Sequence, residues 1–304
     1  AVRVADAAVL VVDALAGPKV GTELAFDFAR EFHLPAMVVI NKMDRENANF
    51  NQALSAMRQR FPNYRFVPVM LPIGAQADFS GVVNVLTQKA YKGAGKDASD
   101  LPGDMADELE MARLELIEAA AESDDALMEK YFETETLSDD EIKEGMRAAA
   151  KNPDLNVVPV FVTSSTHSIG IVPLLEALIV YVAPPSERRV SVEAERGGEI
   201  EFLEGPLSDS GPTVAYVFHS HTDKYGTLTY FRLFNGMLKP NDTLFNLDRG
   251  HEERIGSLMT MRGETQLPLD VLHAGDIGVV AKLRDTNTGH TLAAKAFKKF
   301  ITRP

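Results

Sequence analysis

Short apolar runs, separated by a stretch of helical periodicity, open the chain. Residues 7–12 read AAVLVV and residues 36–40 read AMVVI, and unbroken apolar runs of this length are typical of strands buried on both faces of a sheet. Between them, residues 21–33 repeat apolar side chains such as Leu24 and Phe28 every four positions, which predicts an amphipathic helix. Because short connections join the three segments, we expect a right-handed parallel crossover and an α/β first domain.

The pattern loosens after residue 44 but still predicts regular elements. The expected elements are helix 50–61, strand 65–71, a less regular stretch at 82–91, a long acidic helix or pair of helices over 105–132, helix 138–151, a third buried strand at 157–163 and helix 171–182. The helix at 138–151 begins with SDDE, a capping box in which Ser138 is the cap and Glu141 follows three residues later.

The last third of the chain has a different texture. Residues 189–210 are polar and punctuated by Gly and Pro, so they predict a link between domains. Beyond residue 211, short strand-like segments such as TVAYVFHSH, GTLTYFRLFNG and DIGVVAKL alternate with turns. Short strands at regular spacing predict a closed β-barrel.

Composition supports two domains and excludes several kinds of chemistry. A chain of 304 residues with 45% hydrophobic residues can build two ordinary cores. The net charge of −13 is uneven, since residues 209–304 carry 12 Lys and Arg against 10 Asp and Glu, which leaves 19 against 34 for residues 1–208. Zero cysteines exclude disulfides, zinc thiolates and thiol catalysis. We expect a cytoplasmic protein with no membrane contact, because no apolar run could cross a bilayer.

The most informative polar stretch follows the strand at residues 36–40. Asn41, Lys42 and Asp44 stand in the pattern N-K-x-D, at the carboxyl end of a predicted parallel strand, where open α/β sheets bind ligands. A single carboxylate can accept hydrogen bonds from both N1–H and the amino group of guanine, and adenine lacks that edge. Asp44 would therefore select guanine, while the stem of Lys42 covers the base and Asn41 ties the loop to its neighbours.

A solvated turn after a core strand is the alternative interpretation of N-K-x-D. Three fixed positions occur by chance in roughly a few per cent of chains of this length. The location at the end of an apolar strand favours the base site.

A guanine site also needs a donor for the base oxygen O6. The third buried strand ends in VTSSTHSIG, and the backbone N–H groups of Ser164 or Ser165 would lie at its carboxyl end. The two strand-end loops would then enclose the base. The alternative is a Ser- and Thr-rich turn that caps the helix at residue 171.

Several segments in a fixed order resemble translation elongation factor G. They include ADAAVLVVDALAG, LPAMVVINKMDRENANF, VPVFVTSSTHSIGIVPLLEALIVYVAPPSER and GTLTYFRLFNGMLKPNDTLFN, and the resemblance covers residues 1 to about 292. It implies a partial P-loop-GTPase-type parallel sheet with an inserted α+β subdomain, followed by an all-β translation-factor barrel. The implied domains are a partial GTP-binding domain at 1–188 with its insertion at about 62–156, a linker at 189–210, the barrel at 211–292, and a tail or connection at 293–304.

The length of the insertion distinguishes relatives. Asp44 and Ser164 are separated by 119 residues, far more than small GTPases or the tRNA-delivering elongation factor would have. Release factor three and the tetracycline-resistance ribosomal protection proteins remain alternatives.

The chain departs from the family pattern at the phosphate side. The motif G-x-x-x-x-G-K-[ST] does not occur, and GAGKDAS at residue 93 has the wrong spacing. We therefore expect a fragment that lacks the phosphate loop and the switches, has no catalytic residue of its own and is inactive alone. The resemblance implies GTP or GDP as ligand, with magnesium only in a full-length parent. Ser164 to His167 replace the family's Ser-Ala-x-Lys, which suggests a divergent paralogue.

The resemblance also implies partners. The barrel would rest on small-subunit ribosomal RNA, and the acidic insertion would contact the ribosomal stalk protein; we expect a monomer. The candidate RNA contacts are Lys224, Arg232, Arg254, Arg262, Lys282 and Arg284. His219 and His221 share one side of a strand with Asp223 nearby, but without a third ligand at a convincing spacing we expect surface residues and no metal site.

Three hypotheses for the function follow. The first is a fragment of an elongation-factor-G-like GTPase that binds guanine nucleotide and the ribosome during protein synthesis. The second is a non-catalytic ribosome- or RNA-binding module with a vestigial nucleotide site. The third is an unrelated α/β enzyme that acts on a nucleoside.

Overall fold

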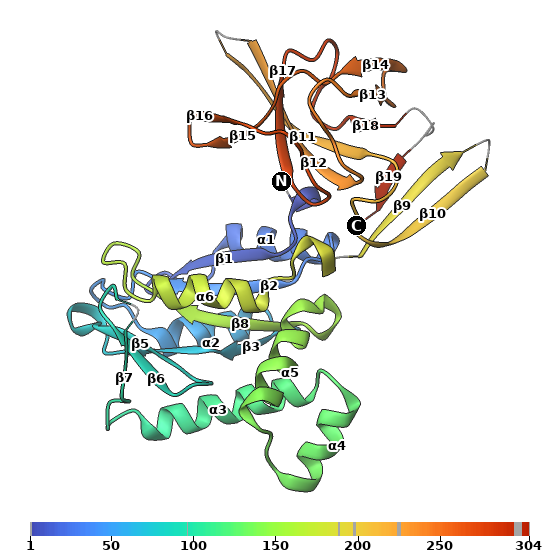
Figure 1. The fold of residues 1–304 in the computed structure, drawn as a ribbon. Helices are drawn as coiled ribbons and strands as arrows, with labels where there is room; N and C mark the ends of the chain where they lie inside the picture. The colour runs from blue at the N-terminus through green and yellow to red at the C-terminus, as the bar shows by residue number, and fades with distance from the viewer. Residues whose placement is uncertain are drawn as a thin grey trace. The chain divides into compact units, whose positions relative to one another are not determined.

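The computed structural model describes residues 2–95, 97–187, 189–196, 199–223, 226–294 and 300–303, with the backbone alone at 189–196, 199–206, 223 and 300–303. Two compact units divide the chain, residues 4–183 and residues 184–304; Figure 1 shows their elements. Within the described ranges, no helix has both the length and the apolar composition that a membrane span requires.

A four-stranded parallel sheet is the centre of the first unit. Its strands follow the order β1-β2-β8-β3, and their bounds are β1 (Ala8–Asp13), β2 (Ala36–Asn41), β8 (Val157–Val162) and β3 (Arg65–Pro68). The helices that accompany this sheet are α1 (Val20–Glu31), α2 (Phe50–Arg60) and α6 (Ile171–Tyr181). The predicted α/β class with a parallel sheet is confirmed.

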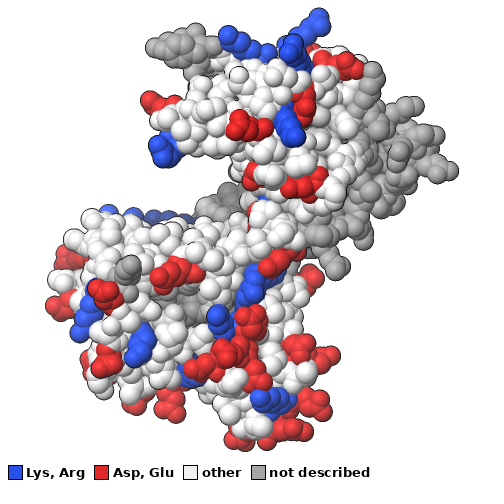
Figure 2. Space-filling view, viewed as in Figure 1, with Lys and Arg blue, Asp and Glu red and all other residues white. Residues whose placement is uncertain are grey.

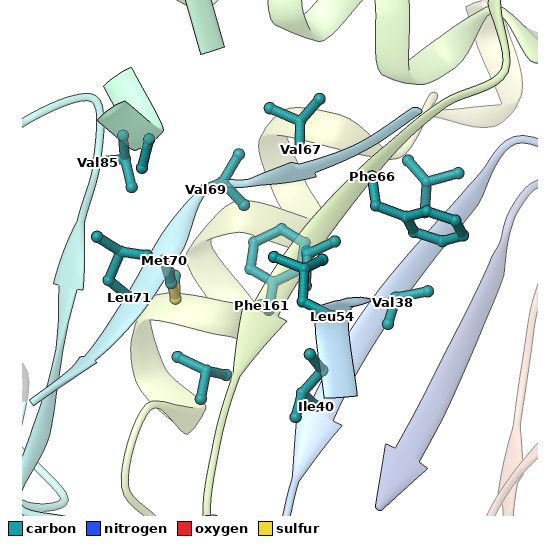
Figure 3. Close-up of a cluster of buried hydrophobic side chains, with 14 of the residues drawn as sticks. Val38, Ile40, Leu54, Phe66, Val67, Val69, Met70, Leu71, Val85 and Phe161 are labelled. Atoms are coloured by element: carbon teal, nitrogen blue, oxygen red, sulfur yellow. The ribbon is translucent and has the colours of Figure 1, made fainter. Parts of the chain in front are cut away.

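The core of this unit lies where β2, β8 and β3 meet the helices. Val38, Ile40, Phe66 and Phe161 are each at most 1% exposed, and Figure 3 shows them beside Leu54 of α2. All six residues of β8 are buried, as expected for an inner strand of a parallel sheet.

The edge strand β1 differs from the sequence prediction. Residues 7–12 were expected to be buried on both faces, but Val9 is 44% and Val11 is 64% exposed. The prediction was wrong because β1 stands at the end of the strand order, and an apolar run does not reveal whether its strand is central. In α1 the apolar repeat through Leu24 and Phe28 is likewise half exposed, and Phe26 and Ala29 are the residues that are buried.

Between β3 and β8 the chain forms a second small sheet and three helices. The antiparallel sheet contains β4 (Met70–Ile73), β5 (Gly81–Asn84), β6 (Lys89–Lys92) and β7 (Ala98–Ser99), in that order. The helices are α3 (Ala106–Ala121), α4 (Asp125–Thr134) and α5 (Asp139–Lys151). The expected single strand 65–71 is broken at Val69, whose N–H bonds Val160 of one sheet while its carbonyl accepts from Val85 beside the other.

Acidic side chains gather over α3, α4 and α5, as Figure 2 shows. The segment 105–132, expected to form either one long helix or a pair, forms the two helices α3 and α4. The capping box is confirmed, because Ser138 N–H donates to Glu141 Oε2 at 2.9 Å and Glu141 N–H donates to Ser138 Oγ at 3.4 Å.

The second unit contains an eight-stranded antiparallel sheet. Its order is β14-β13-β18-β11-β12-β17-β15-β16, and its strands are β11 (Val214–Asp223), β12 (Gly226–Asn235), β13 (Thr243–Asn246), β14 (His251–Arg254), β15 (Leu258–Arg262), β16 (Thr265–Pro268), β17 (Ile277–Ala281) and β18 (Thr291–Ala293). They surround a separate core that includes Val217, Phe231 and Leu292. The all-β class of this part is confirmed.

Residues 189–210 contain regular structure where a link was expected. β9 (Arg189–Arg196) and β10 (Glu199–Pro206) form a hairpin, and β19 (Phe300–Arg303) pairs with β9. The alternation of Val190 with Val192 and of Ile200 with Phe202 is the strand signal. This strand pattern was overlooked because charged residues and glycines surround it in the sequence. The short 3-10 helices are η1 (Val2–Val4), η2 (Gln76–Asp78), η3 (Pro153–Leu155) and η4 (Pro185–Glu187).

Candidate functional site

Three loops meet at the carboxyl edge of the parallel sheet. They follow β1, β2 and β8, which are neighbours in the strand order. Asp13 at the end of β1 is in register with Asn41 at the end of β2, and Thr163 follows β8, whose last residues pair with β2. Parallel strands therefore bring side chains from three distant parts of the sequence to one edge.

Asn41 joins the loop after β2 to the loop after β8. Its Oδ1 accepts hydrogen bonds from Ser165 N–H at 3.0 Å and from the Thr163 hydroxyl at 3.1 Å, and its Nδ2 donates to Ser165 Oγ at 3.0 Å. The backbone adds a bond from Met43 N–H to the Thr163 carbonyl at 3.3 Å. The role predicted for Asn41, tying neighbouring loops together, is the role that these contacts perform.

One carboxylate oxygen of Asp44 accepts no hydrogen bond from the described residues. The Ser164 hydroxyl bonds this carboxylate and holds its pKa below the usual range, although burial acts in the opposite direction. Oδ2 lies 3.6 Å from Nε2 of His167, while Oδ1 is buried and accepts no hydrogen bond from the described residues. A buried acceptor without a donor is costly unless a ligand supplies one. Guanine carries two donors on one edge, so its chemistry fits this group.

Lys42 is held on the opposite side of the loop from Ser165. Its Nζ lies 2.8 Å from Asp13 Oδ2, and Arg45 Nη1 lies 3.8 Å from the same oxygen. Lys42 has φ = 66°, a left-handed conformation that non-glycine residues adopt rarely. The hydrogen bond from Lys42 lowers the pKa of Asp13 to about 2, with help from the N–H groups of Ala16 and Leu15 and against the effect of burial.

The predicted donors for the base O6 are already engaged. Ser164 N–H donates to the Ile169 carbonyl at 3.0 Å, and Ser165 N–H donates to Asn41 Oδ1 at 3.0 Å. Ser164 therefore does not supply its N–H as expected, and Ser165 can do so only by sharing or exchanging its bond to Asn41. The reason is the tight turn between Ser164 and Ile169, whose backbone groups bond each other in both directions.

Sequence reasoning missed Asp13, Thr163 and the position of His167 against Asp44. Asp13 could have been found, because the predicted parallel crossover places the end of its strand beside Asn41. Thr163 ends the VPVFVT run and is 1% exposed, so it looked like a core residue. His167 could not have been found, since its contact depends on the path of the turn after β8.

The basic residues of the second unit have different environments. Four of the candidates are exposed, namely Arg254, Arg262, Lys282 and Arg284. Lys224 lies outside the described residues. Arg232 is 1% exposed and packs over Phe234, 5.5 Å from its ring centre. Its expected role as a surface contact to RNA is therefore wrong, because both faces of β12 are covered near it.

A buried carboxylate supports the loop that carries Arg284. Glu253 is 3% exposed and accepts from Arg284 N–H at 3.0 Å, Asp285 N–H at 2.9 Å and the Thr286 hydroxyl at 2.9 Å. Burial alone would raise the pKa of Glu253, but these donors hold it below the usual range. Arg284 thus stands on a fixed loop.

No group of three His, Asp or Glu side chains with metal-binding geometry is found in the ranges that the structure describes. His219 and His221 lie on β11, and both are exposed.

Comparison with known proteins gives two family matches. Residues 1–184 match the model of the elongation factor Tu GTP binding domain, and residues 226–293 match elongation factor Tu domain 2. Because the first match extends over residues 1–184, the expectation that only the later part of that domain is present is not supported.

A solved structure shares the fold over almost the whole chain. It is the crystal structure of a protein from Thermus thermophilus, with 29% sequence identity and a TM-score of 0.80. The match covers 96% of this chain and 41% of the other, so this chain spans less than half the length of that solved protein.

Proposed function

This chain belongs to the family of the elongation factor Tu GTP binding domain, with an elongation factor Tu domain 2 after it, and we propose that the loops after β2 and β8 bind the guanine base of GTP or GDP. The observation that carries the proposal is Asp44, whose Oδ1 is buried and lacks a donor among the described residues. The N1–H and amino groups of guanine are the donors that such a carboxylate accepts.

The surrounding contacts support base recognition. Asn41 joins the two loops, and the Ser164 hydroxyl stabilises the ionised form of Asp44, since it lowers the pKa of this carboxyl. An ionised carboxylate accepts hydrogen bonds about twice as strongly as a neutral group. The arrangement thus favours guanine and disfavours adenine, which offers no paired donors at the same edge.

We further propose that the chain acts in translation as an elongation-factor-G-like member of this family. The support is the stretch between Asp44 and Ser164, which builds the antiparallel sheet β4 to β7 and the helices α3 to α5. The domain limits 1–188, 189–210, 211–292 and 293–304 remain part of this proposal.

The proposed partner is the ribosome. Arg254, Arg262, Lys282 and Arg284 are available for phosphate contacts to ribosomal RNA. For the stalk protein, part of the acidic insertion is already used: Glu115 and Glu118 of α3 pair with Arg58 and Arg65 at 2.6 and 2.9 Å. Asp139, Glu141 and Glu144 of α5 are paired as well, with Arg113, Lys130 and Arg147. The better candidates for a stalk contact are therefore the exposed acidic residues at the start of α3 and on α4, namely Asp107, Glu110, Asp125, Glu129 and Glu133.

Base preference tests the proposal. GDP, XDP, IDP and ADP are titrated into the ¹⁵N-labelled 304-residue chain, and backbone shifts of the loops after β2 and β8 are followed by NMR. We expect GDP to bind better than ADP. Asp44→Asn should weaken GDP binding about 10- to 100-fold and move the preference to XDP, because the added carbonyl of xanthine accepts from the amide.

The matched control is Asp27→Asn, which removes an exposed carboxylate paired with Arg30 on α1 and should leave the base preference unchanged. Equal binding of GDP and ADP by the wild-type chain, or an unchanged preference in Asp44→Asn, would remove Asp44 from the site.

A non-catalytic RNA-binding module is the second candidate function. The exposed basic residues Arg254, Arg262, Lys282 and Arg284 of the second unit are the observation that favours it. Tight binding of ribosomal subunits that does not respond to GDP or to a non-hydrolysable GTP analogue would support this candidate over the first.

A further inference from the structure

We propose that Asp13 is a positioning residue for the nucleotide base, acting through Lys42. This inference rests on the proposed guanine site and adds the loop after β1 to it. Asp13 holds the ammonium group of Lys42 so that the aliphatic part of that side chain forms one wall of the base site.

The two carboxylate oxygens of Asp13 contact different loops. Oδ1 accepts from the backbone N–H groups of Leu15 at 3.0 Å and Ala16 at 3.1 Å, which fixes the turn after β1. Oδ2 faces the loop after β2 and accepts from Lys42 Nζ at 2.8 Å. One carboxylate therefore joins two loops that are 29 positions apart in the sequence.

The backbone around Asp13 is fixed as well. Asp13 is in register with Asn41, and Ala14 N–H donates to the Asn41 carbonyl at 2.9 Å. Only 22% of the Asp13 side chain is exposed. A rigid, partly buried anion is a good anchor, because little conformational entropy is lost when Lys42 binds to it.

Lys42 needs an anchor for two reasons. Its left-handed φ of 66° costs free energy that surrounding contacts must offset. Its long side chain also has many rotamers, and 41% of it is exposed. A lysine stem that is free to rotate would lose that freedom when a base stacks on it, whereas a stem held at its far end has already lost it.

Asp44 and Lys42 then have different roles in binding the base. Asp44 reads the hydrogen-bonding edge of the base, so it decides which purine binds. Lys42 offers a methylene surface to the flat face of the ring, which all purines share. Asp13 should therefore set affinity for purine nucleotides without changing the choice among them.

The test is Asp13→Asn in the full 304-residue chain. Asparagine keeps an oxygen that can accept from Leu15 and Ala16 but removes the charge that holds Lys42. We expect GDP and IDP to lose affinity equally, about threefold to tenfold, with the ratio of their affinities unchanged. The readout is the same NMR titration, with thermal unfolding measured in parallel.

A double-mutant cycle separates positioning from a merely structural role. In the Lys42→Met background the stem remains but the ammonium is gone, so Asp13→Asn should have no further effect on GDP binding. Asp27→Asn is again the matched control. A loss of GDP affinity of equal size in both backgrounds would show a structural effect of Asp13 and overturn the proposal.

The proposal and the guanine site can fail separately. If Asp44→Asn switches the preference to XDP while Asp13→Asn leaves GDP and IDP affinities unchanged, the base site stands and the role of Asp13 falls. If the wild-type chain does not prefer GDP over ADP, the guanine site itself falls.

Discussion

Two carboxyl groups at the carboxyl ends of β1 and β2 have lowered pKa values for different reasons. For Asp13 the main cause is the hydrogen bond from Lys42, and for Asp44 it is the hydroxyl of Ser164. Both are therefore ionised at neutral pH and differ in their partners. Asp13 has the Lys42 ammonium beside it, whereas Oδ1 of Asp44 is buried and accepts no hydrogen bond from the described residues.

Acid unfolding should report the Asp13 contact. The folded-state pKa of about 2 is lower than the ordinary value near 3.9, so the folded state binds the proton less readily than the unfolded state. The resulting stabilisation is fully present above about pH 4 and is lost as the pH falls toward 2. Asp13→Asn should lower the free energy of unfolding by up to about 2 kcal/mol at pH 7 and by little at pH 2.

Urea unfolding at several pH values, followed by circular dichroism, measures this difference. Asp27→Asn serves as the exposed control. A constant effect of Asp13→Asn between pH 7 and pH 2 would contradict the ionic explanation.

At the residue scale, the sequence predicted the location of the polar residues better than it predicted their hydrogen-bond partners. The pattern N-K-x-D located Asn41 and Asp44 at a strand end, because strand ends follow from periodicity. It could not show that Ser164 N–H is used by Ile169, since that bond depends on a turn closed through space. Arg232 was misjudged because charged residues are rarely buried.

At the scale of elements, the packing of α5 on α3 depends on a glycine. A Cβ at Gly145 would lie 2.6 Å from the Ala120 carbonyl oxygen and 3.0 Å from the Ala120 Cβ. Because the nearest atom belongs to the backbone of α3, the two helices would have to move apart.

Gly145→Ala should therefore destabilise the protein by about 1–3 kcal/mol, even though alanine favours a helix by up to about 1 kcal/mol. Gly21→Ala is the matched control in α1, where a Cβ meets no atom within 4 Å; we expect it to be neutral or slightly stabilising. Urea midpoints of the two variants make the comparison. Equal midpoints would mean that α3 and α5 adjust without cost.

Periodicity predicted which helices and strands exist better than it predicted which of their residues are buried and which strands pair. The helical character of residues 105–132 and the capping box at Ser138 follow from local signals, and both are present, although the break between α3 and α4 was left open. The exposure of Val11 and the hairpin of β9 and β10 depend on which strands become neighbours, a non-local property that an apolar run or a charged run does not contain.

At the scale of the whole molecule, the two units have separate cores. One core collects residues from β1 to α6, and the other collects residues from β11 to β18. Phe66 is 1% exposed in the first and Phe231 is 0% exposed in the second. Each unit should then unfold according to its own stability.

Phe231→Ala should cost the second unit about 3–5 kcal/mol and lower its melting temperature by roughly 10 °C or more, with the first unit unaffected. Phe66→Ala should do the reverse. Differential scanning calorimetry resolves the two transitions. A single transition that moves equally in both variants would show that the units unfold together.

The bond between Asn41 and Ser165 spans 124 positions, and this separation sets the order of events during folding. Contacts between residues so far apart in the sequence form late in folding, because the intervening segment must lose conformational entropy before the contact can stabilise the fold. As the chain leaves the ribosome that makes it, β2 emerges long before β8 and has β1 as its earlier neighbour. A nascent chain that has released only α1 to α5 therefore lacks the loop after β8, which is one side of the proposed base site.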